Sequence, residues 1–412
     1  MKPSAGDPQR VPLGHLALFA SLYAVQGVVV AYITNFNTNY MTARGQSLDG
    51  AATAETIALL PLVFKFLVGP LSDRLDLFGL GHRLPFIVVG VLTQSAGLAG
   101  LALVDPGRHL VLYGAMALVT VLGLAFYDTC CDGMVIDITP PSRRSSVQGL
   151  LWVSRFAATT ICTFGFGRWL DRPGMGQEGV PMVLWACVAL GLVPLLLSRT
   201  APEAPRSADA EGHSWAALGC LARPWTLMLL AYGGLYAMAG VGAEFKLAAY
   251  YKDLGYGPGA IGDLGSVRFL GRAAGALLLP FAGRHLGQRV RLVIGLCGLI
   301  ASTAGQAFIT GPLSAATFAF LFGVANGWSD ALFAVLAMQG SDPRLAASTF
   351  AIIMAVSNLS VAGNAAFAYL ATALGSFRQA YLITAAAIVP LLLFVIPLGR
   401  PGPDGHPVKG PS

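Results

Sequence analysis

Charge is the first thing that this sequence lacks. Asp, Glu, Lys and Arg make up only 11% of its 412 residues, whereas a soluble domain carries about 25%. Hydrophobic residues make up 55%, and the mean hydropathy is +0.66. This composition excludes an ordinary soluble globular protein, because there are too few charged residues to cover its surface.

Cysteine and histidine are also scarce, with six of each. The cysteines lie in or beside apolar stretches, and the adjacent Cys130 and Cys131 lack the spacing of a metal box, so we predict no disulfide and no metal site. The sequence contains no Walker motif and no catalytic constellation. We therefore expect no enzyme, no ATP-driven pump and no cofactor. The net charge of +6 is dispersed over many segments, which argues against a nucleic-acid partner.

What the sequence has instead is long apolar runs. A helix of about 20 apolar residues crosses the hydrocarbon core of a bilayer, which is about 30 Å thick. We predict twelve such helices, over residues 14–40, 53–70, 84–104, 109–137, 146–169, 180–199, 224–251, 258–281, 290–310, 313–338, 345–371 and 377–398.

The second half of the chain repeats the first. The string SLYAVQGV at Ser21–Val28 returns as GLYAMAGV at Gly234–Val241, and both copies lie in apolar runs. Such a repeat is typical of transporters whose halves rock about a central site. Residues 200–222 are rich in Ala, Pro and charge and are interpreted as a cytoplasmic linker. The predicted fold is an all-α integral membrane protein with two pseudo-symmetric six-helix halves, residues 1–199 and 223–412.

The distribution of Lys and Arg predicts the orientation of the chain. If the N-terminus is cytoplasmic, fifteen of the 26 Lys and Arg residues fall in cytoplasmic segments and six in outer ones. This bias places both termini in the cytoplasm. The first apolar run is too long for a cleaved signal peptide, and it recurs as the seventh span. Short loops without a targeting segment favour a bacterial inner membrane, where we expect a monomer surrounded by lipid.

The loop after the second span carries a charged motif. The pattern Gly-x-Leu-x-Asp-Arg, followed by a glycine and a basic residue, matches at Gly69, Leu71, Asp73, Arg74, Gly81 and Arg83. A degenerate counterpart without the acid follows the eighth span, at Gly283, Arg284, Gly287 and Arg289. Asp and Arg side chains at the inner ends of adjacent helices can form charge-assisted hydrogen bonds that latch one conformation. The predicted latch consists of Gly69, Asp73, Arg74, Arg83 and Arg284.

Twelve spans in two halves, with this loop in both, resemble the major facilitator superfamily over essentially the whole chain. Within it, Leu60–Arg74 and Tyr127–Phe156 resemble the group of muropeptide permeases and acetyl-coenzyme A transporters. Folate–biopterin transporters are similar in the same stretch, and sugar–cation symporters share the SDR…GHRLPF element. The permease resemblance implies proton-driven import of a sugar-peptide, with a small-molecule substrate and protons as partners.

Ionisable residues inside the predicted spans are few. Each costs about 2.5–3.5 kcal/mol at the centre of a membrane helix, so these residues should pair, face the interior or line a wet cavity. The ten candidates are Lys65, Arg155, Lys246, Arg268, Arg272, Asp128, Asp132, Glu244, Asp263 and Asp330.

Helical depth suggests which of these charges pair. Asp128 and Arg155 each lie about 13 residues from the turn between spans four and five, so antiparallel neighbours place them at equal depth. Asp132 lies one turn from Asp128 on the same face. Aligning the two halves pairs Asp128 with Asp330, whereas Arg155 aligns with Ser357. Asp330 thus has no obvious cation in its own half and is either protonatable or paired across the halves.

The turn between spans seven and eight gives a second set of pairs. Glu244 and Arg268 fall at similar depth around it, as do Lys246 and Asp263. Arg268 and Arg272 share a helix face, and Arg272 has no acid on an obvious adjacent turn.

We predict that Asp128, Asp132, Glu244 or Asp330 carries a coupling proton. Burial favours a protonated carboxyl and a nearby cation favours an ionised one, so a conformation that breaks the pair moves a proton. The alternative is a set of static pairs that hold helices together. Sodium is a further alternative, since Asp128 and Asp132 offer hard oxygen ligands.

Basic and polar side chains are the candidates for substrate binding. An Arg fork matches a carboxylate or phosphate, while Lys65 can instead snorkel to the inner surface. Tyr23 and Tyr236 occupy equivalent positions of the two repeats, and ordinary packing is the alternative role for each. The candidates are Tyr23, Gln26, Lys65, Arg155, Tyr236, Arg268, Arg272 and Asn358.

The sequence therefore predicts a secondary active transporter of a small anionic or zwitterionic solute, working by alternating access and proton symport. A drug or metabolite exporter that uses proton antiport is one alternative. A non-transporting assembly factor of the same fold is another, and it predicts a sealed interior in which every charge is paired.

Overall fold

The computed structural model describes residues 11–68, 71–72, 75–76, 81–139, 144–203, 215–283, 285–341 and 346–400. These residues form helices and connecting turns and contain no strand. The predicted all-α class is therefore confirmed.

Twelve helical segments in the described residues are long and apolar enough to cross a bilayer. They are Leu13–Ala43, Leu48–Leu67, Leu84–Leu103, Leu110–Val135, Gly149–Leu170, Gly176–Ser198, Pro224–Asp253, Pro258–Phe281, Gln288–Phe308, Pro312–Gly340, Thr349–Leu374 and Phe377–Leu398. Each overlaps one predicted span. The largest difference is at the second, predicted from residue 53 and observed from Leu48, because Ser47 caps that helix by accepting a hydrogen bond from the Gly50 amide (3.0 Å).

The chain divides into two compact units. Unit 1 contains the described residues of Met1–Gly212 and Gly255–Asp263, and unit 2 those of His213–Leu254 and Leu264–Ser412.

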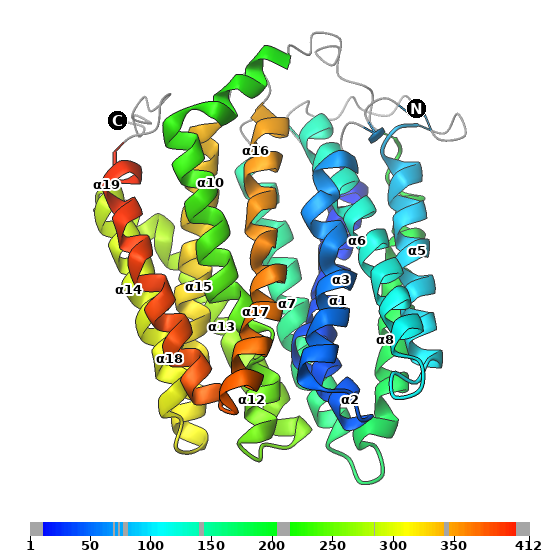
Figure 1. Cartoon of the computed structure of the whole chain (residues 1–412). Helices are drawn as coiled ribbons and strands as arrows, with labels where there is room; N and C mark the ends of the chain where they lie inside the picture. The colour runs from blue at the N-terminus through cyan, green and yellow to red at the C-terminus, as the bar shows by residue number, and fades with distance from the viewer. Residues whose placement is uncertain are drawn as a thin grey trace. The chain divides into compact units, whose positions relative to one another are not determined.

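Unit 1 is a bundle in which α1 packs on α7, α5 packs on both α6 and α8, and α3 packs on α6 (Figure 1). Its core gathers apolar side chains of these helices, among them Leu18, Phe19, Val91 and Leu184. Gly27 lets α1 approach α7 closely, because a Cβ there would overlap the carbonyl oxygen of Arg155. Its elements are α1 (Leu13–Tyr32), η1 (Ile33–Asn37), α2 (Thr38–Ala43), α3 (Leu48–Phe64), η2 (Lys65–Leu67), α5 (Leu84–Leu103), α6 (Leu110–Ile138), α7 (Arg144–Leu170), η5 (Gly176–Gly179), α8 (Val180–Gly191) and α9 (Val193–Ser198).

Unit 2 is built around α14, which packs on α15 and α18, while α17 packs on η8 and α11. Tyr232, Leu296, Phe333 and Leu336 are among its fully buried core residues. Its elements are η7 (Trp215–Ala222), α10 (Pro224–Tyr236), η8 (Ala237–Val241), α11 (Gly242–Glu244), α12 (Leu247–Asp253), α13 (Pro258–Gly283, whose first residues belong to unit 1), α14 (Gln288–Gly305), η9 (Gln306–Phe308), α15 (Pro312–Gly340), α16 (Ala346–Ala355), η11 (Val356–Leu359), α17 (Ser360–Leu374), α18 (Phe377–Ile388), η12 (Val389–Phe394) and α19 (Val395–Leu398).

The first spans of both units contain a π-helical turn, a feature that occurs mostly at functional sites. In unit 1 this turn is η1, and in unit 2 it is η8. The repeated strings do not place them equivalently: η8 lies inside the second string, whereas Ser21–Val28 lies wholly in α1. Span seven is also interrupted a second time, at Phe245 and Lys246, between α11 and α12.

Candidate ion and substrate sites

In unit 1, polar side chains from three spans meet at two carboxylates. Lys65 Nζ lies 2.8 Å from Asp128 Oδ2, and Gln26 Nε2 donates to Asp128 Oδ1 at 2.5 Å. One turn along α6, Asp132 Oδ1 accepts a hydrogen bond from the Tyr23 hydroxyl at 2.5 Å. Tyr23 and Gln26 are three residues apart on α1, so they reach carboxylates that are themselves one turn apart. We call these five residues the Asp128 group.

The Asp128 group is mostly sealed from solvent. The side chain of Asp128 is 9% exposed and that of Lys65 is 28% exposed. Because an uncompensated buried carboxylate is costly, the ammonium and the amide donor are what allow Asp128 to be charged here. Among the described residues, Asp132 makes no ion pair, and Tyr23 is its hydrogen-bond donor.

The predicted pair between Asp128 and Arg155 is wrong. Lys65 takes the place of Arg155, whose guanidinium lies over the Trp152 ring at 5.4 Å. Equal depth fixes the position of a residue along a helix but not the direction in which its side chain points. Snorkelling, the alternative considered for Lys65, is not what the structure has, since the ammonium pairs with Asp128.

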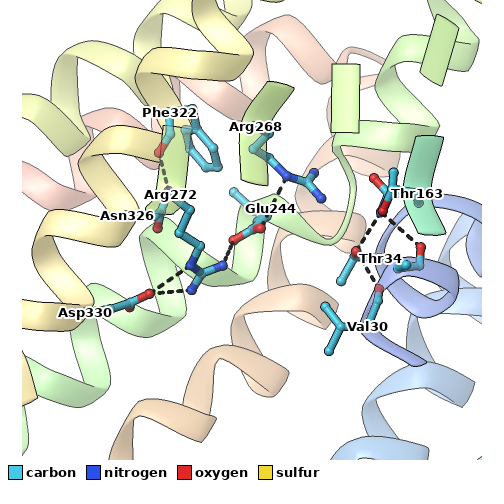
Figure 2. Close-up of polar contacts among 12 residues, drawn as sticks. Val30, Thr34, Thr163, Glu244, Arg268, Arg272, Phe322, Asn326 and Asp330 are labelled. Atoms are coloured by element: carbon cyan, nitrogen blue, oxygen red, sulfur yellow. Dashed lines mark hydrogen bonds and ion pairs between the residues drawn. The ribbon is translucent and has the colours of Figure 1, made fainter. Parts of the chain in front are cut away.

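In unit 2, Arg272 bridges two acids. Its Nη1 donates to Glu244 Oε2 at 2.7 Å, while Nε and Nη2 donate to Asp330 Oδ2 at 2.9 and 2.5 Å (Figure 2). Arg268 Nε lies 3.3 Å from Glu244 Oε1, which confirms that predicted pair. The Tyr236 hydroxyl lies 3.3 Å from Asp330 Oδ1. We call these five residues the Arg272 group.

Two expectations about the Arg272 group are wrong. Asp330 does have a cation in its own unit, and Arg272 does have acids within reach. Arg155 aligns with Ser357 on the eleventh span, but the cation comes from the eighth. The two units therefore repeat the same contacts between corresponding spans. In each unit, a cation from the second span pairs with the acid at the equivalent position of the fourth span. A tyrosine from the first span also forms a hydrogen bond to a fourth-span acid.

Glycines hold α13 and α15 close together beside Arg272. Gly271 and Gly275 on α13 face α15, and Gly323 and Gly327 on α15 face α13. A Cβ at Gly327 would overlap the carbonyl oxygen of Arg272. Small residues four apart allow such backbone approach in membrane helices. This approach brings Arg272 within bonding distance of Asp330.

The remaining candidates lie elsewhere. Asp263 pairs with Arg168 at 2.8 Å. Lys246 belongs to the other unit, so its predicted pair with Asp263 stays a prediction. Both side chains of the observed pair are well exposed. Lys246 is fully buried, and Asn358 is half-buried in η11.

Of the predicted latch, Gly69, Asp73, Arg74 and Arg284 lie outside the described residues. Arg83 is described, and its guanidinium donates to Asp137 Oδ2 at 3.0 Å and to Ser72 Oγ at 2.7 Å. Glu203, just after α9, accepts hydrogen bonds from the backbone amides of Arg83 and Leu84 at 2.9 and 2.7 Å. The start of α5 is therefore tied both to the end of α6 and to the segment that follows α9.

Sequence reasoning missed three ionisable members of this cluster, His82, Asp137 and Glu203. His82 lies between Asp137 and Glu203, with nitrogen–oxygen distances of 3.6 and 3.3 Å. Asp137 ends span four and Glu203 begins the predicted linker, so neither lies in the loop that carries the recognised motif. The sequence did contain a signal for the contact with Glu203. The backbone amides in the first turn of a helix such as α5 have no partner within the helix, so they attract a carboxylate.

Comparison with known proteins now decides the family. The model of the Major Facilitator Superfamily matches residues 14–363. The chain belongs to this superfamily. The facilitator is therefore a multi-pass membrane transporter, and the resemblance drawn from the loop motif is confirmed.

The facilitator is also similar to characterised members. It is 24% identical over 398 residues to the anhydromuropeptide permease of Escherichia coli (strain K12), covering 91% of this chain and 76% of that protein. This match confirms the resemblance to the muropeptide permease group.

Three solved structures share the fold of the facilitator. That of the nucleoside transporter NupG has a TM-score of 0.70 at 14% identity and covers 94% of this chain and 99% of its own. A D-xylose-proton symporter has a TM-score of 0.74 at 14% identity, covering 92% and 95%. A bacterial homologue of the human lysosomal transporter Spinster, inward-facing and unoccupied, has 0.68 at 15%, covering 94% and 96%.

Proposed function

We propose that this facilitator is a proton-coupled symporter of a small, polar, anionic or zwitterionic solute. The observation that carries the proposal is the repeated arrangement in the two units, where a cation of the second span holds an acid of the fourth. Unit 1 then supplies the coupling proton site, and unit 2 supplies the cation that binds the substrate.

The Asp128 group is suited to binding one proton. Two carboxylates one helical turn apart, with Cβ atoms about 5–6 Å apart, face one ammonium. If both carboxylates are ionised, the group carries a net negative charge in a mostly sealed place, which is unfavourable. Lys65 compensates Asp128 directly, so Asp132 is the carboxylate that takes the proton and releases it when the group rearranges.

The Arg272 group is suited to exchanging partners. A guanidinium binds a carboxylate or a phosphate through parallel hydrogen bonds, and Arg272 already makes three such bonds to Glu244 and Asp330. An anionic solute would compete with these two acids for the guanidinium of Arg272. Glu244 lies on the short α11, between the π-helical turn and the second interruption of span seven. Interrupted membrane helices are a common place for substrate sites in transporters.

The nature of the relatives supports small polar substrates. The names of the matched proteins refer to anhydromuropeptide, nucleoside and D-xylose, the last with a proton. We propose a location in a bacterial inner membrane, with both termini cytoplasmic, a monomeric state and residues 200–222 as the cytoplasmic linker between six-helix halves 1–199 and 223–412.

One observation favours the non-transporting alternative. The cations Lys65 and Arg272 both already hold acids, as static pairs in an assembly factor would. Proton movement driven by a solute separates the two functions.

The test uses purified protein in liposomes that contain a pH-sensitive dye. Anhydromuropeptide fragments, nucleosides and D-xylose are added in turn, and internal acidification is recorded. We expect one class to acidify the lumen. Asp132→Asn, which keeps an oxygen for Tyr23, should abolish acidification while solute exchange without a gradient persists. The exposed Asp253→Asn serves as the matched control. If Asp132→Asn acidifies the lumen as the wild type does, this proton site is refuted.

A further inference from the structure

Unit 2 brings two arginines together where one span begins and a neighbouring span ends. Arg289 lies in the first turn of α14, and Arg400 follows the end of α19 after one glycine. The side-chain amide of Gln288 donates to the carbonyl oxygens of Leu398 and Arg400, the latter at 3.2 Å. The stem of Arg289 lies against Gly399, where an added Cβ would overlap its Cγ atom. Both arginines therefore stand at the junction of α14 and α19, which pack on each other (Figure 1).

This junction carries positive charge without a counter-charge. Among the residues that the structure describes, no acid pairs with the guanidinium of Arg289 or of Arg400. The first turn of α14 contains no acid and no side-chain cap, and it contains a further arginine, Arg291. Basic side chains are unfavourable at the start of a helix, because its free amides already give that end a partial positive charge. An anion at this junction would relieve the repulsion.

The corresponding end of unit 1 has an acid where unit 2 has none. In the charged motif that the two halves share, Arg289 is the counterpart of Arg83. The guanidinium of Arg83 is held by Asp137 on α6 at 3.0 Å. The alignment of the fourth and tenth spans pairs Asp137 with Gln339, which carries no charge. The arginine has therefore been kept in the second half, whereas the carboxylate that neutralises it has not.

The segments that follow the last span of each unit differ in the same sense. In unit 1, the carboxylate of Glu203 accepts hydrogen bonds from the backbone amides of Arg83 and Leu84 at the start of α5. In unit 2, the segment after α19 offers backbone carbonyl oxygens to Gln288 and brings the side chain of Arg400 to this place. Unit 2 thus keeps the contact between its last span and the start of its third span, but it replaces the acid of this contact by a cation.

Exposed aliphatic side chains continue from the two arginines along both helices. Val293 lies one turn from Arg289 on the same face of α14, and Leu393 and Ile396 precede Arg400 on η12 and α19. All three aliphatic side chains are exposed. Basic groups at the end of membrane helices, next to an apolar strip, match a phospholipid, whose phosphate lies at the interface and whose acyl chains lie beside the spans.

We propose that Arg289 and Arg400 bind the headgroup phosphate of an anionic phospholipid, with an acyl chain along α14 and α19. A guanidinium binds phosphate oxygens through parallel hydrogen bonds, and here the phosphate takes the place that carboxylates occupy in unit 1. The general excess of basic residues at the cytoplasmic ends of spans does not require two of them to meet at one glycine. The binding does not depend on the proposed function; only its assignment to the cytoplasmic leaflet uses the proposed orientation.

Native mass spectrometry of the full-length protein in a neutral detergent tests this site. Phosphatidylglycerol and phosphatidylcholine with identical acyl chains are titrated separately, and the dissociation constant of the first bound lipid is measured. We expect phosphatidylglycerol to bind more tightly, and Arg289→Gln and Arg400→Gln each to weaken its binding by about fivefold. Arg199→Gln is the matched control, because this exposed arginine follows α9 as Arg400 follows α19; it should leave the binding unchanged.

Four results would overturn the proposal. Two are equal affinity for the two lipids and an unchanged affinity for phosphatidylglycerol when both arginines are replaced. The third is soluble glycerol phosphate binding as tightly as the lipid, which would show a site for a free anion. The last concerns Asp404, which lies outside the described residues: a preference for phosphatidylglycerol that exists only in Asp404→Asn would show that the chain's own acid fills the site. If Arg289→Gln does not fold, Arg400→Gln, beyond the end of α19, carries the test alone.

Discussion

The pair of Lys65 and Asp128 gives the sharpest test of the energetics. Lys65→Met keeps most of the stem and removes the charge, which leaves the Asp128 carboxylate, 9% exposed, with the Gln26 amide as its donor. Breaking a buried ion pair costs about 3–5 kcal/mol, and since the Lys65 side chain is 28% exposed we expect the low end, about 3 kcal/mol. Asp128→Asn leaves the half-buried ammonium of Lys65 unpaired, so we expect the free energy of unfolding to fall by about 2 kcal/mol.

A double-mutant cycle isolates the pair. The doubly substituted protein buries no unpaired charge, so we expect it to lose about 3 kcal/mol rather than the sum of the single losses, a coupling of about 2 kcal/mol. Reversible unfolding in mixed micelles, titrated with a denaturing detergent, gives the free energies. Arg155→Met is the matched control: Arg155 makes no ion pair among the described residues and should cost less than about 1 kcal/mol. Additive losses in the double variant, or a larger loss in Arg155→Met than in Lys65→Met, would refute this account.

Two further predictions concern packing and capping. Gly327→Ala should lower the free energy of unfolding by about 1–3 kcal/mol, because the added Cβ overlaps the carbonyl oxygen of Arg272. Gly149→Ala, which has open space around it, should not lower it in the same unfolding titration. Equal losses in the two variants would contradict the glycine contact. Glu203→Gln replaces charge-assisted bonds to the backbone amides at the start of α5 by neutral ones and weakens them by about 1 kcal/mol. Hydrogen exchange at those amides should then be about fivefold faster, with Asp253→Asn unchanged; exchange at the wild-type rate would show that Glu203 is not a cap.

Much of the architecture could be predicted from the sequence because hydropathy reports it directly. The twelve spans follow from runs of apolar residues, and the largest boundary difference lies where the Ser47 cap extends a helix. The identity of the buried charges was also readable, since an ionisable residue in an apolar run is rare enough to notice.

The partners of these charges could not be predicted in the same way. Depth along a helix is one coordinate, whereas pairing also needs the rotation of each helix about its axis and the choice of neighbour. Asp128 was therefore matched to Arg155 when Lys65, on another span, was within reach. The π-helical turns leave no pattern in the sequence that predicts them.

The glycine contact between α13 and α15 has a consequence for movement. Two helices whose backbones touch over successive turns cannot slide or rotate against each other without steric overlap, so the cation of α13 and the acid of α15 travel as one rigid body. Glu244 lies on the short helix α11, which is flanked by a π-helical turn and a break and whose own glycine contact, Gly242 against Gly363, is with α17. A change of partners at the guanidinium must therefore move α11 away from α13 and α15, and we expect structural differences between functional states of unit 2 to concentrate where the seventh span and α17 meet these two helices.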